Sequence, residues 1–254
     1  MKAFIICLPQ KENSITHSRK TKDILTGYGY DAELFEGISG TDAVELAHKE
    51  KRKAYPYGIK TTELEVDSIK KYIKDNLWEE FLDNFIITVQ EKSRYVGNKI
   101  DKISSPGVKG CFYSHYRLWE KCTELDEPIM IFEDDVKIYR NVNFEEYHWQ
   151  DILILAFGKT LYKGEPYKTY LENPKGPLQI IPWTNSSMPG TQAYAIKPNA
   201  AKKLVKHYRP WFLPSDNAIH SSICKIEILT HVMGRELFRD EGNSSAVRTK
   251  GETW

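Results

Sequence analysis

The feature that most constrains this chain is a short apolar run that ends in three consecutive carboxylates. The run reads IMIF at positions 129–132, and Glu133, Asp134 and Asp135 follow it directly. A run of this length bounded by turn residues is typical of a buried strand. Carboxylates in that position repel one another unless a cation lies between them, and hard oxygen donors suit Mg²⁺ or Mn²⁺. The triplet therefore predicts a metal site at the end of a strand, with a solvated acidic turn as the alternative.

A helix is predicted just before this strand, from about Gly110 to Thr123. One stripe of the helix collects mainly apolar side chains at helical spacing: Cys111, His115, Leu118, Trp119 and Cys122. Pro106 and Gly107 break the chain upstream, so the free amides of the helix start, at Lys109 and Gly110, could receive a diphosphate. A simple tight turn is the alternative for this segment. His115 is interpreted as a hydrogen-bonded core histidine rather than a ligand.

The rest of the chain indicates an α/β fold with a mixed, mostly parallel central sheet flanked by helices. Strands are predicted at residues 3–8, 30–35, 151–156, 178–181 and 192–196, and helices at 16–27 and 198–208. A helical insert is predicted at about residues 60–97, where a capping box precedes an apolar stripe. Residues 159–189 form a Pro- and Tyr-rich loop. We expect residues 1–254 to form a single domain.

Composition excludes several classes of protein. Lys and Arg total 36 against 35 Asp and Glu, so no basic field favours nucleic acid or anionic membranes. The four cysteines form no C-x-x-C pair, which is typical of reduced thiols. We find neither a signal peptide nor a membrane-spanning run, so a cytoplasmic protein is expected, bacterial or, if viral, in the host cytoplasm.

Three segments together resemble glycosyltransferase family 25, the lipooligosaccharide-type transferases that include the collagen galactosyltransferases. They are GCFYSHYRLW (110–119) with its following IMIFEDDV, FEGISG (35–40) and GTQAYAIKPNAAKKLV (190–205). Ser39 stands where the family has Asp, and residues 50–104 and 159–185 match nothing in the family pattern.

The resemblance implies a GT-A-like domain that transfers a sugar from a nucleotide sugar, expected to be UDP-linked, to an acceptor hydroxyl, with inversion and with Mn²⁺ or Mg²⁺. Asp135 would bind the metal directly, and Glu133 or Asp134 directly or through water. One late histidine, His231 or His220, would complete the metal shell.

The resemblance also implies substrate sites. The nucleotide sugar is expected at the end of the first strand and near the loops that follow: Leu8, Pro9, Arg19, Gly37, Lys109 and Gly110. Arg19 matches an arginine of the family's first helix, although a solvated helix arginine is equally compatible with the sequence. Apart from the resemblance, Trp183 and Tyr194 are expected to contact the acceptor; Trp183 could stack on a sugar face, with anchoring of the long loop as its alternative. Asp216, in a Pro-x-Asp segment, is the expected catalytic base, with a helix N-cap as the alternative.

Three other functions remain open at this stage. The acceptor is expected to be a surface oligosaccharide, but a hydroxylated base in phage DNA is the alternative acceptor. The same carboxylates would also suit a metal-dependent nucleotidyltransferase or phosphohydrolase. An inactive protein that only binds nucleotide sugars is the remaining alternative.

Overall fold

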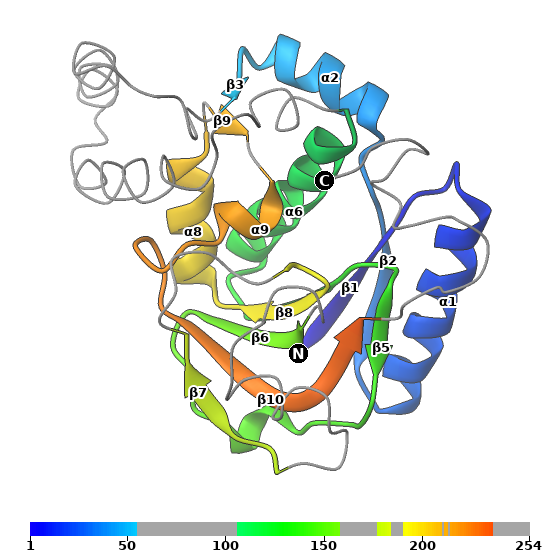
Figure 1. Cartoon of the computed structure of the whole chain (residues 1–254), viewed down its shortest axis with the longest axis vertical. Coiled ribbons are helices and arrows are strands. Elements are labelled where there is room, and N and C mark those ends of the chain that lie inside the picture. Colours follow the sequence, from blue (N-terminus) through cyan, green and yellow to red (C-terminus); the bar gives the residue numbers. More distant parts are fainter. Residues whose placement is uncertain (55–105, 158–176, 184–189, 210, 213, 236–254) are drawn as a thin grey trace, which may run out of the picture.

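The computed structural model describes residues 1–54, 106–157, 177–183, 190–209, 211–212 and 214–235. Within these ranges, one large sheet carries helices on both of its faces (Figure 1). The helical insert predicted at residues 60–97 and most of the loop predicted at 159–189 lie outside the described residues.

The sheet is mixed, with most strands running in one direction. Its eight strands follow the order β2-β1-β4-β8-β6-β10-β5, and β7 pairs with β10 beside this path. Their bounds are β1 Lys2–Cys7, β2 Asp31–Glu36, β4 Ile129–Phe132, β5 Val136–Ile138, β6 Ile152–Phe157, β7 Ile180–Pro182, β8 Ala193–Ile196 and β10 Ile226–Arg235. The pairings give β2, β1, β4, β6 and β10 one direction, and β8, β5 and β7 the opposite one. This confirms the predicted mixed, mostly parallel sheet.

Alternation along the strands divides the core into two layers. In β1, Phe4 and Ile6 pack on one face of the sheet, and Ala3 and Ile5 pack on the other. The first layer holds the buried side chains of α2 (Gly40–Lys49), α6 (Pro106–Leu125), α8 (Pro198–His207) and α9 (Ser215–Ala218). The second holds Leu25 of α1 (Glu12–Gly27) and the segment from β5 through the 3₁₀ turn Phe144–Glu146. Both faces of β4 are therefore buried, as its apolar sequence predicts.

Helix α6 begins four residues earlier than predicted, at Pro106. Proline suits the first turn of a helix, because the amide that it lacks would have no partner inside the helix. Gly110 thus lies in the second turn, and its amide is not at the helix start. Helix α1 likewise begins at Glu12 rather than near residue 16.

Two glycines let the start of α2 approach α6 closely. A Cβ on Gly110 would lie 2.7 Å from the carbonyl oxygen of Ile38, and a Cβ on Gly40 would lie 2.8 Å from the carbonyl carbon of Pro106. Only glycine leaves room for backbone at this distance. Ser114 of α6 fixes the same contact, since its hydroxyl accepts from the Ile38 amide at 2.8 Å. The loop after β2 is thereby held against α6.

A charge run such as HKEKRK at residues 48–53 is typical of a solvated helix face, but Arg52 departs from this expectation. Its side chain is 4 % exposed and donates to Glu50 at 2.6 Å and to the carbonyl of Tyr208 at 2.8 Å. Its guanidinium also lies 4.0 Å from the ring centroid of Tyr116. The segment turns inward at Lys51, whose φ is 53°, and continues into β3 (Lys53–Ala54), which pairs in parallel with β9 (Trp211–Phe212). Arg52 therefore ties the end of α2 to α6 and α8.

Two predictions from composition can be compared with the described residues. The four cysteines are free, and Cys7, Cys122 and Cys224 are buried, as expected for reduced thiols. No helix in the described ranges has the length and apolarity needed to cross a bilayer.

Candidate active site

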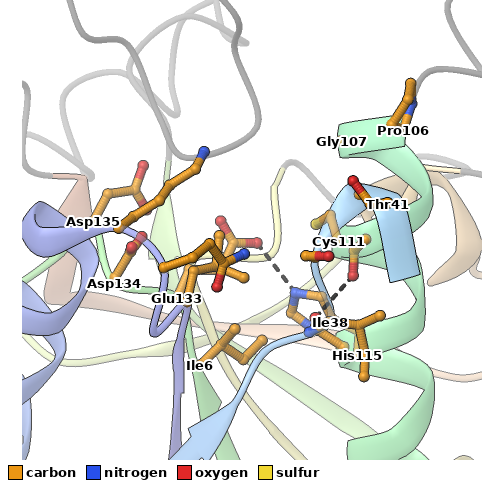
Figure 2. Close-up of a pocket in the computed structure, with 17 residues that line it drawn as sticks. Ile6, Ile38, Thr41, Pro106, Gly107, Cys111, His115, Glu133, Asp134 and Asp135 are labelled. Carbon is orange, nitrogen blue, oxygen red and sulfur yellow. Dashed lines mark hydrogen bonds and ion pairs between the residues drawn. The ribbon is translucent and has the colours of Figure 1, made fainter. Parts of the chain in front are cut away.

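A pocket of about 430 Å³ lies where β1 and β4 end, between the loop after β2 and the first turns of α6 (Figure 2). Its size is within the range of small-molecule sites. One part of the lining is apolar and comes from Ile6, Leu8 and Ile38. The other part is polar, with Lys11, Ser39, Thr41, Cys111, Ser114, His115, Glu133, Asp134 and Asp135. The carboxylate triplet therefore opens into a cavity rather than onto a convex surface.

The end of β4 presents the three carboxylates in different environments. Figure 2 shows Glu133 between the two aspartates on one side and Cys111 and His115 of α6 on the other. Asp135 is buried, whereas Glu133 and Asp134 are half-buried. Burial raises the pKa of Asp134, and the neighbouring charge of Glu133 raises it further, although a hydrogen bond from Ser14 lowers it. The pocket therefore holds negative charge that its surroundings compensate only in part.

Glu133 belongs to a buried network of hydrogen bonds. Its Oε1 accepts from Thr191 Oγ1 and lies 3.2 Å from His115 Nε2. His115 Nδ1 lies 2.9 Å from the hydroxyl of Tyr194, to which Trp119 Nε1 donates at 2.9 Å. His115 is thus fully buried and hydrogen-bonded, as the sequence interpretation proposed, and it also lines the pocket.

A second branch of this network passes through Cys111. Its Sγ lies 3.1 Å from Ser215 Oγ, which is 2.9 Å from Thr191 Oγ1. Burial, followed by the charge of Glu133, raises the pKa of the Cys111 thiol well above its usual range. Such an environment is typical of a cysteine that packs and forms weak hydrogen bonds.

The potential metal ligands differ in part from the predicted triplet. Among the described residues, one group of three donors lies within 4.8 Å of one another, and it consists of Cys111, His115 and Glu133. The triplet itself does not form such a group. A soft sulfur ligand and a hydrogen-bonded imidazole suit Mg²⁺ or Mn²⁺ less well than the carboxylates of Glu133, Asp134 and Asp135. The pocket residues therefore fit a hard divalent cation through their carboxylates.

Most of the predicted nucleotide-binding residues lie beside the pocket rather than in it. Leu8 and Gly110 line it, whereas Pro9 and Arg19 are exposed and outside its lining. Gly37 is buried against β1, where a Cβ would lie 2.9 Å from Cγ2 of Ile6. Lys109 is directed elsewhere, with its Nζ 5.0 Å from the ring centroid of Phe212. Helix α6 starts at Pro106 rather than Gly110, so a diphosphate at Lys109 and Gly110 would lie in the helix rather than at its first residue, and the site stays a prediction.

The residues predicted to contact the acceptor are both buried. Trp183 is 5 % exposed in the main core, and its amide donates to the carbonyl of Ile226 at 2.8 Å. Tyr194 is fully buried, and its hydroxyl serves the network beneath the pocket. Neither residue lines the pocket, and their contact with the acceptor stays a prediction.

The structure describes the side chains of Asp216 and His220, but not that of His231. Asp216 is the second residue of α9, whose N-cap is Pro214, so the alternative that Asp216 is the helix cap is wrong. Its carboxylate accepts from the Asn217 amide at 3.0 Å and lies near enough to Cys111 for its charge to raise the pKa of that thiol. His220 is buried and bonded to Ser222. His231 belongs to β10, and its side chain lies outside the described atoms.

Several site residues were not predicted from the sequence. The Ser14 hydroxyl accepts from the amide of Leu8 at 2.9 Å and donates to Asp134, so it ties α1 to the end of β1 and to the triplet. Thr191 holds Glu133, and Lys11 brings a cation to the lining. Small hydroxyl residues carry no sequence signal by themselves. Thr191, however, lies within residues 190–205, one of the three segments that resemble the family. Ser39, the departure from the family pattern, caps α2 by accepting from the Asp42 amide.

Comparison with known proteins identifies the family. The model of "Glycosyltransferase family 25 (LPS biosynthesis protein)" matches residues 1–219. The chain is 27% identical over 150 residues to the lipooligosaccharide biosynthesis protein lic2B of Haemophilus influenzae, covering 54% of this chain and 56% of the relative. It is 31% identical over 128 residues to the lipooligosaccharide biosynthesis protein lex-1 of H. influenzae (strain ATCC 51907 / DSM 11121 / KW20 / Rd), covering 46% and 41%. The chain thus matches about half the length of these curated relatives. The family match, which covers most of the chain, shows that this protein belongs to glycosyltransferase family 25.

Proposed function

We propose that this protein is a metal-dependent glycosyltransferase that moves a sugar from a nucleotide sugar, UDP-linked, to a hydroxyl of an oligosaccharide acceptor, with inversion at the anomeric carbon. The observation that carries the proposal is the carboxylate triplet lining a pocket at the ends of β1 and β4 in a member of this family. Ligands of open α/β sheets bind at this edge.

The acidic end of the pocket suits a divalent cation. The raised pKa of Asp134 indicates that the negative charge here is only partly compensated. A bound cation would complete this compensation. Asp135 and Glu133, with Asp134 directly or through water, would hold Mn²⁺ or Mg²⁺. When bound, the metal would neutralise the charge that grows on the departing diphosphate. Lys11 lines the same pocket and adds a fixed positive charge near this position.

The apolar end of the pocket suits a nucleobase. Ile6, Leu8 and Ile38 provide apolar surface near the end of β1, and the loop after β2 is held there by its contacts with α6. Ser39 of this loop and Thr41 of α2 add polar groups to the same lining. A nucleoside diphosphate would thus lie with its base on β1 and its phosphates toward the carboxylates.

Asp216 is proposed as the base that accepts the proton of the acceptor hydroxyl. It follows Ser215, whose hydroxyl reaches Cys111 and Thr191 at the floor of the pocket. Asp216→Asn keeps the shape of the side chain and removes its basicity, so turnover should fall roughly 10²- to 10⁴-fold with donor binding little changed. A nearly silent substitution would remove Asp216 from the mechanism, and an equal loss of donor affinity would make it a donor ligand instead.

The acceptor is proposed from the relatives, which are named for lipooligosaccharide biosynthesis. The decisive experiment incubates the purified protein with UDP-, GDP- and CMP-sugars, Mn²⁺ and a panel of acceptors, and follows the products by mass spectrometry. A glycosylated oligosaccharide together with intact UDP is the expected result. Glycosylated DNA bearing hydroxylated bases would change the acceptor class, and a cleaved diphosphate would indicate a phosphohydrolase or nucleotidyltransferase. Metal-dependent UDP binding without any turnover would indicate a protein that only binds nucleotide sugars.

The donor can be tested without turnover. UDP with Mn²⁺ should raise the melting temperature well above the value with UDP alone, because the cation bridges the carboxylates and the diphosphate. Equal shifts from UDP, GDP and CMP would argue against a specific nucleotide site.

A further inference from the structure

The imidazole of His115 lies at the floor of the pocket with both ring nitrogens in hydrogen-bonding range. Nδ1 is 2.9 Å from the hydroxyl of Tyr194, and Nε2 is 3.2 Å from Oε1 of Glu133. The ring is fully buried and stacks on the Tyr194 ring at 5.7 Å between centroids. It therefore has a single orientation, set by its neighbours.

The direction of each hydrogen bond follows from the groups on either side of His115, because the carboxylate of Glu133 can only accept and His115 Nδ1 is the acceptor within reach of the Tyr194 hydroxyl. An indole N–H can only donate, and Trp119 donates to the Tyr194 oxygen at 2.9 Å. Tyr194 keeps its own proton, because burial raises its pKa well above the usual value. That proton points to His115 Nδ1, which then accepts it. A neutral imidazole that accepts at Nδ1 carries its hydrogen on Nε2, and Nε2–H donates to Glu133.

Glu133 Oε1 is held by two donors from different elements. His115 Nε2 reaches it from α6, and Thr191 Oγ1 reaches it from the segment before β8. Two donors on one carboxylate oxygen fix the rotation of the carboxylate, in the way that outer hydrogen bonds orient metal-ligating groups.

We propose that His115 is a positioning residue, which with Tyr194 fixes the carboxylate orientation that Glu133 presents to a divalent cation in the pocket. The proposal rests on the metal assignment in the proposed function. In this arrangement, Nε2 carries a proton for Glu133, and the Cys111 thiol is engaged with Ser215.

A pair of substitutions at His115 separates positioning from packing. In His115→Gln, the amide nitrogen takes the place of Nε2 and still donates to Glu133. In His115→Asn, the shorter amide stays near Tyr194 and does not reach Glu133. Mn²⁺ titration followed by electron paramagnetic resonance should show affinity lowered roughly 10- to 100-fold in His115→Asn but about threefold or less in His115→Gln. Loss of packing alone would weaken both variants alike, and this result would overturn the proposal.

Tyr194→Phe tests the next bond in the chain. It removes the hydroxyl that sets the His115 tautomer, so Mn²⁺ affinity should fall by roughly 3- to 10-fold. Tyr116→Phe is the matched control, because Tyr116 is another buried tyrosine of this core whose hydroxyl donates to the Val205 carbonyl at 3.2 Å, away from the pocket. Equal effects of the two Tyr→Phe changes would overturn the proposal.

The tautomer can be read directly by nitrogen-15 NMR of histidine-labelled protein. The wild type should show the Nε2–H form of His115, and Tyr194→Phe should populate the Nδ1–H form as well. An Nδ1–H form in the wild type would overturn the assignment, whatever the variants do. If the wild type binds no Mn²⁺, the metal assignment of the proposed function fails, and the tautomer measurement decides whether His115 donates to Glu133. If Mn²⁺ binds as expected but no acceptor is glycosylated, the proposed transfer fails while the positioning role stands.

Discussion

Stability at acidic pH should depend strongly on His207. This residue lies on α8 and is 4 % exposed, and burial together with the nearby His220 lowers its pKa from 6.5 to about 3. The unfolded chain therefore binds a proton on this histidine between pH 6.5 and about 3, while the folded protein does not. His207 therefore does not lower the free energy of unfolding above pH 6.5, but it lowers this free energy progressively as the pH falls below 6.5. The difference between the unfolded and folded pKa values corresponds to a total loss of about 5 kcal/mol, of which about 3 kcal/mol is lost by pH 4.

The test is urea unfolding of the wild type and of His207→Leu at about pH 7 and about pH 4. The wild type should lose about 3 kcal/mol more than the variant between these two conditions, because only the wild type has to keep this buried imidazole neutral. Leu204→Ala, a change at a fully buried neighbour on α8, is the control, since it removes packing without removing a titratable group. An equal loss in wild type and His207→Leu would refute the reasoning.

Three further predictions concern the pocket and its supports. Asp135→Asn should leave the fold intact and abolish both Mn²⁺ binding and transfer, and excess EDTA should abolish transfer by the wild type; full activity in either assay would remove the metal. Gly110→Ala should lower the free energy of unfolding by about 1–3 kcal/mol, because the new Cβ would meet the backbone of residues 38–40. Gly27→Ala, which has no heavy atom within 4 Å of its Cβ, should be neutral or slightly stabilising in the same assay. Arg52→Met should cost about 2–4 kcal/mol and Arg117→Met less than about 1 kcal/mol, because the first guanidinium is buried and the second is 34% exposed; equal costs would contradict the role given to Arg52.

The framework of the fold could be predicted from the sequence because it depends on local patterns. The apolar runs at residues 3–8, 129–132 and 151–156 are strands of the central sheet, within about one residue of their predicted ends. Their burial on both faces explains why each run is continuous rather than alternating. The strand ending in the triplet also led to the pocket, since the edge where parallel strands end can be inferred without knowing the neighbours.

Single-residue roles could not be predicted, because they depend on contacts between distant segments. Tyr194 was expected at the acceptor, yet three-dimensional packing places its hydroxyl between Trp119 and His115. Arg52 was expected in solvent because its neighbours are charged, yet one φ of 53° at Lys51 precedes its turn into the core. No local pattern reports either outcome.

The three segments that resemble the family are far apart in sequence but meet at one place. Gly110 and Ser114 of the first contact Ile38 of the second, and Thr191 of the third holds Glu133 at the end of the first. These contacts bury polar groups, which costs free energy unless each group has a partner, and they demand glycine where any Cβ would meet backbone. The convergence is therefore best explained by the need to hold the carboxylates of the pocket in a defined geometry, which makes His115 and Thr191 part of the site although neither would have to touch the transferred sugar.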